Sequence, residues 1–289
     1  MMQLENSHLR IRVAQKGAEL QSIFNKDNGL EYLWNGDPAF WGKKSPVLFP
    51  IVGGLKNNTY TYNGTPYQLG RHGFARDLPF TLTANTSDGL SFTLDANETT
   101  QQQYPFLFRF TITYTIDRNV LSCHYQVTNI DIKPMFFSVG AHPAFRVPLV
   151  EGTGFEDYYL QFDAKETTGQ WPLSPEGLIK KEPVPFFHNN DRIKLTKALF
   201  YGDALVFKGL NSTAISLHNN KTGHGFTLKY NKFPYMGIWS AKDADFVCIE
   251  PWCGIADAVD STGNIRNKEG VNLLFPGEQF NRTWSVEVF

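Results

Sequence analysis

The chain is poor in several features that would place it in other classes of protein. Its 289 residues include only 3 cysteines and 4 methionines, and 27 basic residues nearly balance 28 acidic ones. A net charge of −1 gives no general attraction to nucleic acid or to an anionic membrane surface, so neither partner is expected. No apolar run approaches a membrane span, and residues 1–12 contain no signal-peptide core.

The cysteines lack the spacing of a metal site or a disulfide framework. Cys123, Cys248 and Cys253 are odd in number, and each lies in or beside an apolar run. This usage predicts reduced thiols in a cytoplasmic protein. A bridge between Cys248 and Cys253 stays open as the less favoured alternative.

Aromatic residues and a hydrophobic period of two are abundant. Aromatics make up 15% of the chain, which is too rich for a disordered protein. Apolar and polar residues alternate over 106–116 and again over 121–127, which predicts a long hairpin with one apolar face. Short strands with turn signals recur elsewhere, without an internal repeat, a linker or a long amphipathic helix. The pattern predicts one all-β domain over residues 1–289, a large antiparallel β-sandwich.

Local signals predict three further features. Asn63-Gly64 lies between two strand-like segments and indicates a hairpin turn. Residues 151–192 hold several Gly and Pro among charged residues and are expected to form an irregular excursion, either the rim of a site or a surface extension. His124 falls on the polar face of the long hairpin, and we interpret it as structural or solvated.

His142 is the first candidate for chemistry. It follows a β-like run at 135–139, and Pro143 restricts it to extended geometry and ends a regular ladder. Histidine exchanges protons near neutral pH, so a rigidly held acid or base is one interpretation. A core histidine packed under Phe145 is the other.

Glu250 is the second candidate. It follows four apolar residues, and Pro251 is predicted to stop this buried strand at once. A carboxylate in such a place needs partners or a cleft, and beside Trp252 it suits a polar ring with an apolar face. A glutamate bonded to nearby backbone in a corner stays the alternative.

Taken together, these stretches resemble a known family. His72–Arg76, Gly140–Phe145 and Cys248–Asp257, preceded by Leu48–Gly53, resemble the aldose 1-epimerase (galactose mutarotase-like) superfamily, in the branch that includes the LacX type. The resemblance covers nearly the whole chain. It implies a curved sandwich that holds a sugar on its concave sheet, and an isomerase that interconverts the α and β anomers of an aldohexose. It implies no cofactor or metal, a small-molecule sugar as partner, and a monomer or homodimer.

The resemblance also implies roles for individual residues. Glu250 matches the family's general base, His142 its general acid, and His72 a second histidine near the ring oxygen. Asp203 resembles an acid that grips hydroxyls far from C1, and Trp239 resembles an aromatic beside the sugar. A turn residue and ordinary core packing remain the other interpretations of these last two.

Positive charge around His72 bears on the identity of the sugar. Arg71 and Arg76 flank this histidine, and guanidinium groups recognise hydroxyl pairs, carboxylates and phosphate. Relatives often carry an arginine soon after the first glycine of Val52-Gly53. This chain departs from that pattern, so either Lys56 or Arg71 is expected to supply the charge.

Two alternative functions stay open. A hexose-6-phosphate mutarotase would use the arginines for its phosphate, and a non-catalytic carbohydrate-binding protein would keep the cleft without turnover. The unphosphorylated sugar is favoured, because Asp203 at the distal end would repel a phosphate at C6.

Overall fold

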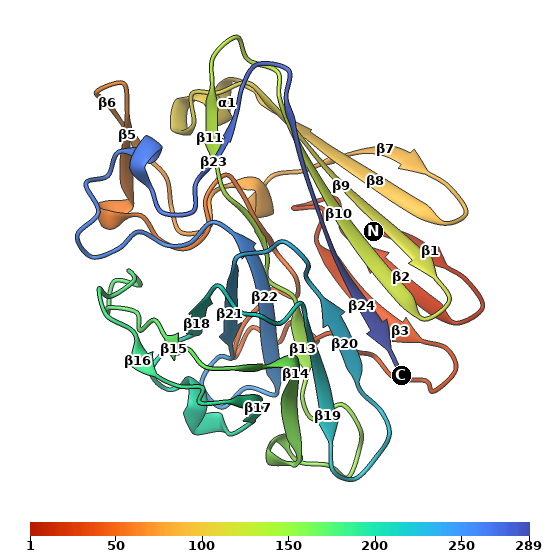
Figure 1. Ribbon diagram of the computed structural model, residues 1–289. Helices are drawn as coiled ribbons and strands as arrows, with labels where there is room; N and C mark the ends of the chain where they lie inside the picture. Colours follow the sequence, from red (N-terminus) through yellow and green to blue (C-terminus); the bar gives the residue numbers. More distant parts are fainter.

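Strands are the main secondary structure of the molecule, as Figure 1 shows. The computed structural model describes residues 1–289. The α-helix α1 (Glu98–Gln103) is short, and five single 3-10 turns lie at Lys56–Asn58, Ala75–Asp77, Phe155–Asp157, Lys197–Phe200 and Ile265–Asn267. None of these helices has the length and apolarity needed to cross a membrane.

The largest sheet has nine strands, all paired antiparallel. Their spatial order is β17 (Asn190–Lys194), β14 (Tyr158–Glu166), β19 (Ala214–Asn219), β20 (Phe226–Lys229), β24 (Gln279–Val288), β10 (Val120–Asn129), β9 (Phe108–Asp117), β8 (Gly89–Asp95) and β7 (Thr81–Asn85). The predicted long hairpin is its β9–β10 pair, in which every second residue is buried. This confirms the antiparallel sandwich expected from the period of two.

A second sheet of six strands carries the two candidate catalytic residues. Its order is β18 (Leu205–Lys208), β21 (Tyr235–Trp239), β22 (Phe246–Cys253), β12 (Val139–Ala141) and β4 (Val47–Leu48), with β13 (Ala144–Arg146) also pairing with β22. Every residue of β22 is buried, so this strand lies at the centre of the molecule.

Smaller sheets and hairpins complete the fold. They are the three-stranded sheet β1 (Met2–Glu5), β2 (Leu9–Val13) and β3 (Leu20–Asn25), and the pairs β5 (Thr59–Tyr62) with β6 (Thr65–Gln68), β11 (Met135–Phe137) with β23 (Asn272–Leu274), and β15 (Gly169–Gln170) with β16 (Val184–Pro185). Asn63-Gly64 joins β5 to β6, both residues with positive φ, as the sequence predicts.

Aromatic contacts join the two large sheets. Phe49, next to β4, stacks on Phe110 of β9 with ring centroids 4.7 Å apart. Phe145 of β13 stacks on Phe226 of β20 at 4.0 Å. A cluster of 67 buried apolar residues fills the space around them. The six-stranded sheet is therefore supported from behind by a packed core, which holds the strands of the site in place.

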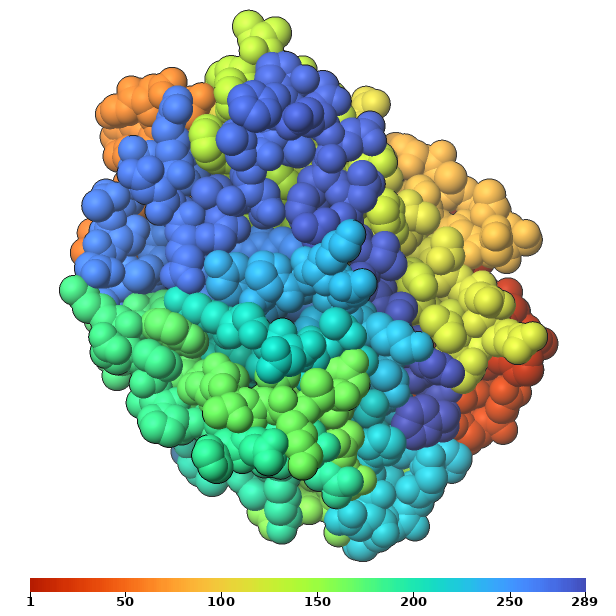
Figure 2. All heavy atoms as spheres, viewed as in Figure 1, coloured from red at the N-terminus to blue at the C-terminus, as the bar shows by residue number.

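The prediction of an irregular 151–192 excursion is wrong in part. Tyr158–Glu166 forms β14, which pairs with β17 and β19 inside the large sheet. Its buried and less buried residues alternate at first, but flanking Gly and Pro residues hide this period in the sequence. In Figure 2 the green part of the chain, which contains the excursion, packs without a break against the cyan and blue parts.

The prediction that Pro251 ends its strand is also wrong. Strand β22 continues through Pro251 to Cys253. On one edge of β22, the pairing strands β12 and β13 are interrupted at His142 and Pro143. The amide of Ile249 in β22 points to this edge, because it donates to the carbonyl of Pro143. Alternate residues point their amides the same way, so the missing N–H of Pro251 faces the interruption. Glu250 therefore projects from within a strand, opposite the break that carries His142.

Candidate functional site

The predicted site residues lie around one cavity of about 780 Å³. All seven contribute to its lining: Arg71, His72, Arg76, His142, Asp203, Trp239 and Glu250. They come from the six-stranded sheet and from loops beside it; Arg71, His72 and Arg76 share one segment, and the other four lie in separate parts of the sequence. The fold therefore brings together every residue that was singled out for the site.

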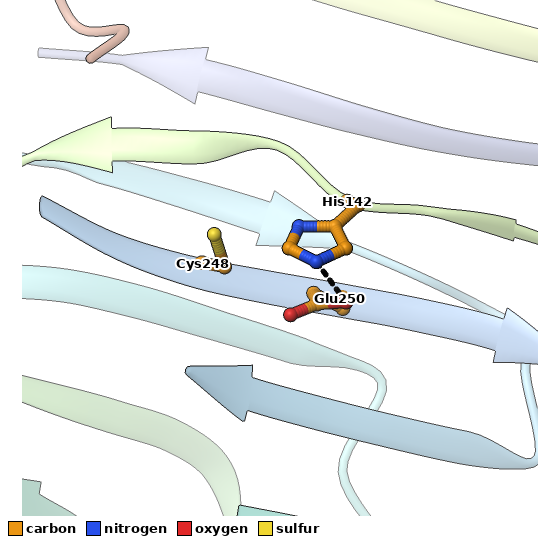
Figure 3. A group of neighbouring side chains, drawn as sticks. All are labelled: His142, Cys248 and Glu250. Carbon is orange, nitrogen blue, oxygen red and sulfur yellow. Dashed lines mark ion pairs between the residues drawn. The ribbon is translucent and has the colours of Figure 1, made fainter. Parts of the chain in front are cut away.

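His142 and Glu250 are in direct contact. Nε2 of His142 lies 3.3 Å from Oε2 of Glu250, and the two side chains are only 10% and 2% exposed. Figure 3 shows the imidazole reaching from the break between β12 and β13 over strand β22, toward the carboxylate. The arrangement places a proton donor and a proton acceptor side by side in the cavity wall.

Burial shifts both members of this pair toward their uncharged forms. It lowers the pKa of His142 to about 3, and the nearby charges of Arg76 and Arg71 add to the effect. It raises the pKa of Glu250 well above 4.5; Asp203 adds to this, while Trp252 and Arg71 oppose it. Both shifts favour the uncharged forms of the two groups, a carboxyl group facing a neutral imidazole, over an ion pair.

An aromatic cluster holds the His142 ring. Trp41 stacks on it with centroids 4.9 Å apart and planes at 25°, and Trp239 meets it edge-on at 5.7 Å. Trp41 was not predicted as a site residue. The sequence places it after a turn-rich stretch, where nothing indicates that it reaches a histidine about a hundred residues further along the chain. Trp239 packs against a buried apolar cluster, which confirms its core role, and it also lines the cavity, so a place beside a sugar stays a prediction.

His72 is fixed by a backbone amide. The N–H of Gly53 donates to Nδ1 of His72 over 3.1 Å, and the carbonyl of Gly53 accepts from the His72 amide at 2.9 Å. Because Nδ1 accepts a hydrogen bond, the ring proton lies on Nε2. Burial lowers the pKa of His72 well below 6.5, and the proximity of His142 and of the Arg76 and Arg71 guanidinium groups adds to the effect. His72 is therefore a neutral donor with a defined tautomer.

A buried ion pair supports the loop that carries Gly53. Nζ of Lys268 lies 2.8 Å from Oδ1 of Asp257, and both side chains are 3% exposed. The second oxygen of Asp257 accepts from the amide of Lys56, and its own amide donates to the carbonyl of Gly54. A Cβ on Gly53 would lie 2.4 Å from that of Ala256. The close approach explains why glycine stands there.

Asp203 has the turn role, and its role as a ligand for hydroxyls stays a prediction. Its Oδ1 accepts from the amide of Ala204 at 2.7 Å, just before β18, which is the turn role. Its φ of 88° is unusual for a residue with a side chain. It also lines the cavity, so its carboxylate is available to a ligand as well.

The two arginines differ in their partners. Arg76 has its Nε 3.5 Å from Asp77 and donates through Nη2 to the carbonyl of Arg71. The guanidinium of Arg71 has no carboxylate within 4 Å. Lys56 points elsewhere, since its Nζ donates to the carbonyl of Val259. Arg71, not Lys56, therefore brings unpaired positive charge to the cavity.

Part of the excursion forms a wall of the cavity. Residues of the turn from Leu173 to Lys180 line it. Gly177, with a φ of +75°, lies against Arg71 so closely that an added Cβ would come 1.5 Å from Nη2. Of the two roles left open for the excursion, this segment takes that of a rim.

Comparisons with known proteins agree with this fold. The family model for aldose 1-epimerase matches residues 1–287. The chromosomal protein LacX of Lactococcus lactis is 32% identical over 296 residues, and the match covers 99% of each of the two chains.

All three cysteines of the chain are free, so the alternative of a Cys248–Cys253 bridge is not realised.

Solved structures give the same result. A galactose mutarotase related enzyme from Lactobacillus acidophilus superposes with a TM-score of 0.94 at 35% identity and covers 100% of this chain and 97% of its own. A galactose mutarotase-like protein from Lactobacillus casei has a TM-score of 0.91 at 32% identity, with full coverage of both chains. The chain belongs to the aldose 1-epimerase family, in the branch of the LacX proteins.

Proposed function

We propose that the protein is a mutarotase that interconverts the α and β anomers of an aldohexose. The observation that carries the proposal is the 3.3 Å contact between Nε2 of His142 and Oε2 of Glu250 in the wall of a cavity of about 780 Å³. Anomer exchange needs a base at the O1 hydroxyl and an acid at the ring oxygen, and these two side chains can serve as that pair.

The shared proton first passes from Glu250 to Nε2 of His142 across their 3.3 Å contact, and the ring opens from the charged form of the pair that results. The Glu250 carboxylate accepts the proton of the O1 hydroxyl while His142 donates its proton to the ring oxygen O5. The C1–O5 bond breaks and C1–O1 becomes an aldehyde. Neither residue gains or loses a proton to solvent in this step.

The ring closes by the reverse transfers on the other face of the aldehyde. After rotation about C1–C2, neutral His142 takes the proton of the O5 hydroxyl, and Glu250 returns a proton to O1 as C1–O5 forms. Both residues end as they began. His72 donates from Nε2 to the ring oxygen region throughout, because the Gly53 amide keeps its tautomer fixed.

The distal end of the sugar is assigned to Asp203 and the arginines. Asp203 would accept hydrogen bonds from hydroxyls there, which favours an unphosphorylated hexose such as galactose or glucose. The unpaired guanidinium of Arg71 favours the second candidate, a hexose 6-phosphate. We keep the neutral sugar first, because Asp203 in the lining of the same cavity would repel a phosphate at C6.

The remaining assignments are proposals of the same kind. We propose that residues 1–289 act as one domain, as a monomer or a homodimer, with a small sugar as partner and neither nucleic acid nor membrane. Anomer-exchange NMR on a panel of sugars tests the function. Faster exchange than in buffer supports a mutarotase, whereas binding by saturation transfer without exchange identifies a carbohydrate-binding protein.

A further inference from the structure

A thiol lies beside the catalytic pair. Cys248 and Glu250 are two residues apart on β22, so their side chains leave the same face of the strand. One donor atom each from His142, Cys248 and Glu250 lies within 4.8 Å of the others, and all three residues are buried. Figure 3 shows the sulfur and the carboxylate on the same side of β22, with the imidazole next to both.

We propose that His142, Cys248 and Glu250 form a site for a zinc-type divalent cation in the wall of the cavity. Thiolate, imidazole and carboxylate are the three ligand types that zinc takes from proteins. His142 and Glu250 line the cavity and Cys248 is fully buried, so a further coordination position on the cavity side would be left for water or for a sugar oxygen. The spacing along the chain follows no zinc motif, because β22 and the interrupted strand beside it bring the ligands together.

The same contacts indicate that the ion is exchangeable. Metal-binding histidines normally donate their second nitrogen to a partner, whereas Nδ1 of His142 has none in the protein. The ion must also separate His142 from Glu250 and displace the thiol proton of Cys248 to solvent. Because of these costs, we expect the ion to bind reversibly as an inhibitor and not as a resident metal.

The ion is expected to compete with the sugar. It would use Nε2 of His142 and an oxygen of Glu250, the atoms assigned to proton transfer. This part of the inference rests on the proposed function, while binding of the metal does not.

Cobalt absorption tests the site without reference to activity. Tag-free, reduced protein is titrated with Co²⁺, and the thiolate-to-metal charge-transfer band in the near ultraviolet is recorded. The parent and Cys253→Ser are expected to show the band at one ion per chain, because Cys253 is a buried thiol outside the cluster. Cys248→Ser is expected to lack it. A parent without the band, or a band that persists in Cys248→Ser, overturns the site.

Two additions keep the result clear. Circular dichroism checks that Cys248→Ser is folded, and Cys248→Ala replaces it if it is not. The affinity for Zn²⁺, measured by competition with Co²⁺, is expected to fall in either variant by more than the roughly 10–100-fold that losing a hydrogen-bond partner of a ligand costs.

Kinetics test the competition. Zn²⁺ is expected to slow anomer exchange by the parent, with an apparent inhibition constant that rises with sugar concentration, and a chelator is expected to restore the rate. Inhibition that is independent of sugar overturns the shared position. A parent that exchanges no anomers would contradict the proposed function alone, and the cobalt band would then decide the metal site.

Discussion

The amide of Gly53 donates a hydrogen bond to Nδ1 of His72 over 3.1 Å. This contact joins a buried loop to a ring in the lining of the cavity, and it decides which nitrogen carries the proton. Protonation of His72 would set two donors against each other at Nδ1, which agrees with a pKa lowered well below 6.5 by burial. His72 then acts as a hydrogen-bond donor and not as a second acid.

We expect His72 to stay in the Nε2–H form throughout the neutral range. Nitrogen NMR of the imidazole checks this directly, because protonated and unprotonated nitrogens have different shifts. His72→Gln can still donate and should keep more activity than His72→Phe, which removes the donor. For His72→Phe, a loss approaching the roughly 10²–10³-fold of a missing preorganised donor is expected. A ring that titrates near pH 6.5 would contradict the assignment.

Glu250→Gln is expected to make the protein more stable at neutral and alkaline pH. The folded protein holds the Glu250 proton more tightly than the unfolded chain, because burial raises the pKa above 4.5. Stability contributed by this proton is complete below pH 4.5 and is lost as pH rises toward the folded value, at about 1.4 kcal/mol for each unit of pKa difference. Glutamine carries no such pH dependence.

Urea unfolding at several pH values measures the difference between parent and Glu250→Gln. The difference in unfolding free energy should grow between pH 4.5 and 8. A gap that is constant or that narrows with pH would show that Glu250 is not held protonated.

Asp257→Ala should destabilise the protein strongly. It leaves Lys268 buried at 3% exposure without its partner, and breaking such a pair costs about 3–5 kcal/mol. The double variant Asp257→Asn with Lys268→Met keeps an acceptor for the Lys56 amide and removes the stranded charge, so it should recover most of the loss. Urea midpoints check both. Equal loss in the single and double variants would mean that the charge is not the cause.

Anomer exchange should be accelerated more for free galactose or glucose than for glucose 6-phosphate at equal concentration. The carboxylate of Asp203 in the same cavity would repel a phosphate at C6. Exchange NMR of the three sugars gives the comparison. Catalysis confined to the phosphorylated sugar and lost in Arg71→Ala would reverse the choice of the unphosphorylated sugar. In that case Gly177→Ala, which crowds the Arg71 guanidinium, would also weaken catalysis on the phosphorylated sugar.

The sequence predicts the fold better than the details of the site. Alternation over the β9–β10 hairpin and the Asn63-Gly64 turn depend on local chemistry, and the structure confirms them. The course of β22 through Pro251 depends on a break in a neighbouring strand 109 positions earlier, from Pro251 back to His142. Local rules cannot supply that information, so they end the strand too soon.

The same limit applies to the residues around His142. Its place between strands follows from Pro143 and is predictable, whereas the stacking of Trp41 and the wall formed by Leu173–Lys180 arise only when distant segments meet. The contact between Gly53 and His72 is also a product of tertiary structure. The family motifs identify the polar residues that we propose for the site. They do not identify the aromatic and backbone groups that position those residues.

The central claim is that Glu250 and His142 exchange protons with the sugar. It is tested most directly by anomer-exchange rates of Glu250→Gln and His142→Asn with the parent's preferred sugar, after circular dichroism shows that both are folded. Each substitution removes one proton-transfer group with little change of shape. A loss of roughly 10²–10⁴-fold in each supports the account. A folded variant of either kind that exchanges anomers at the parent's rate would contradict it.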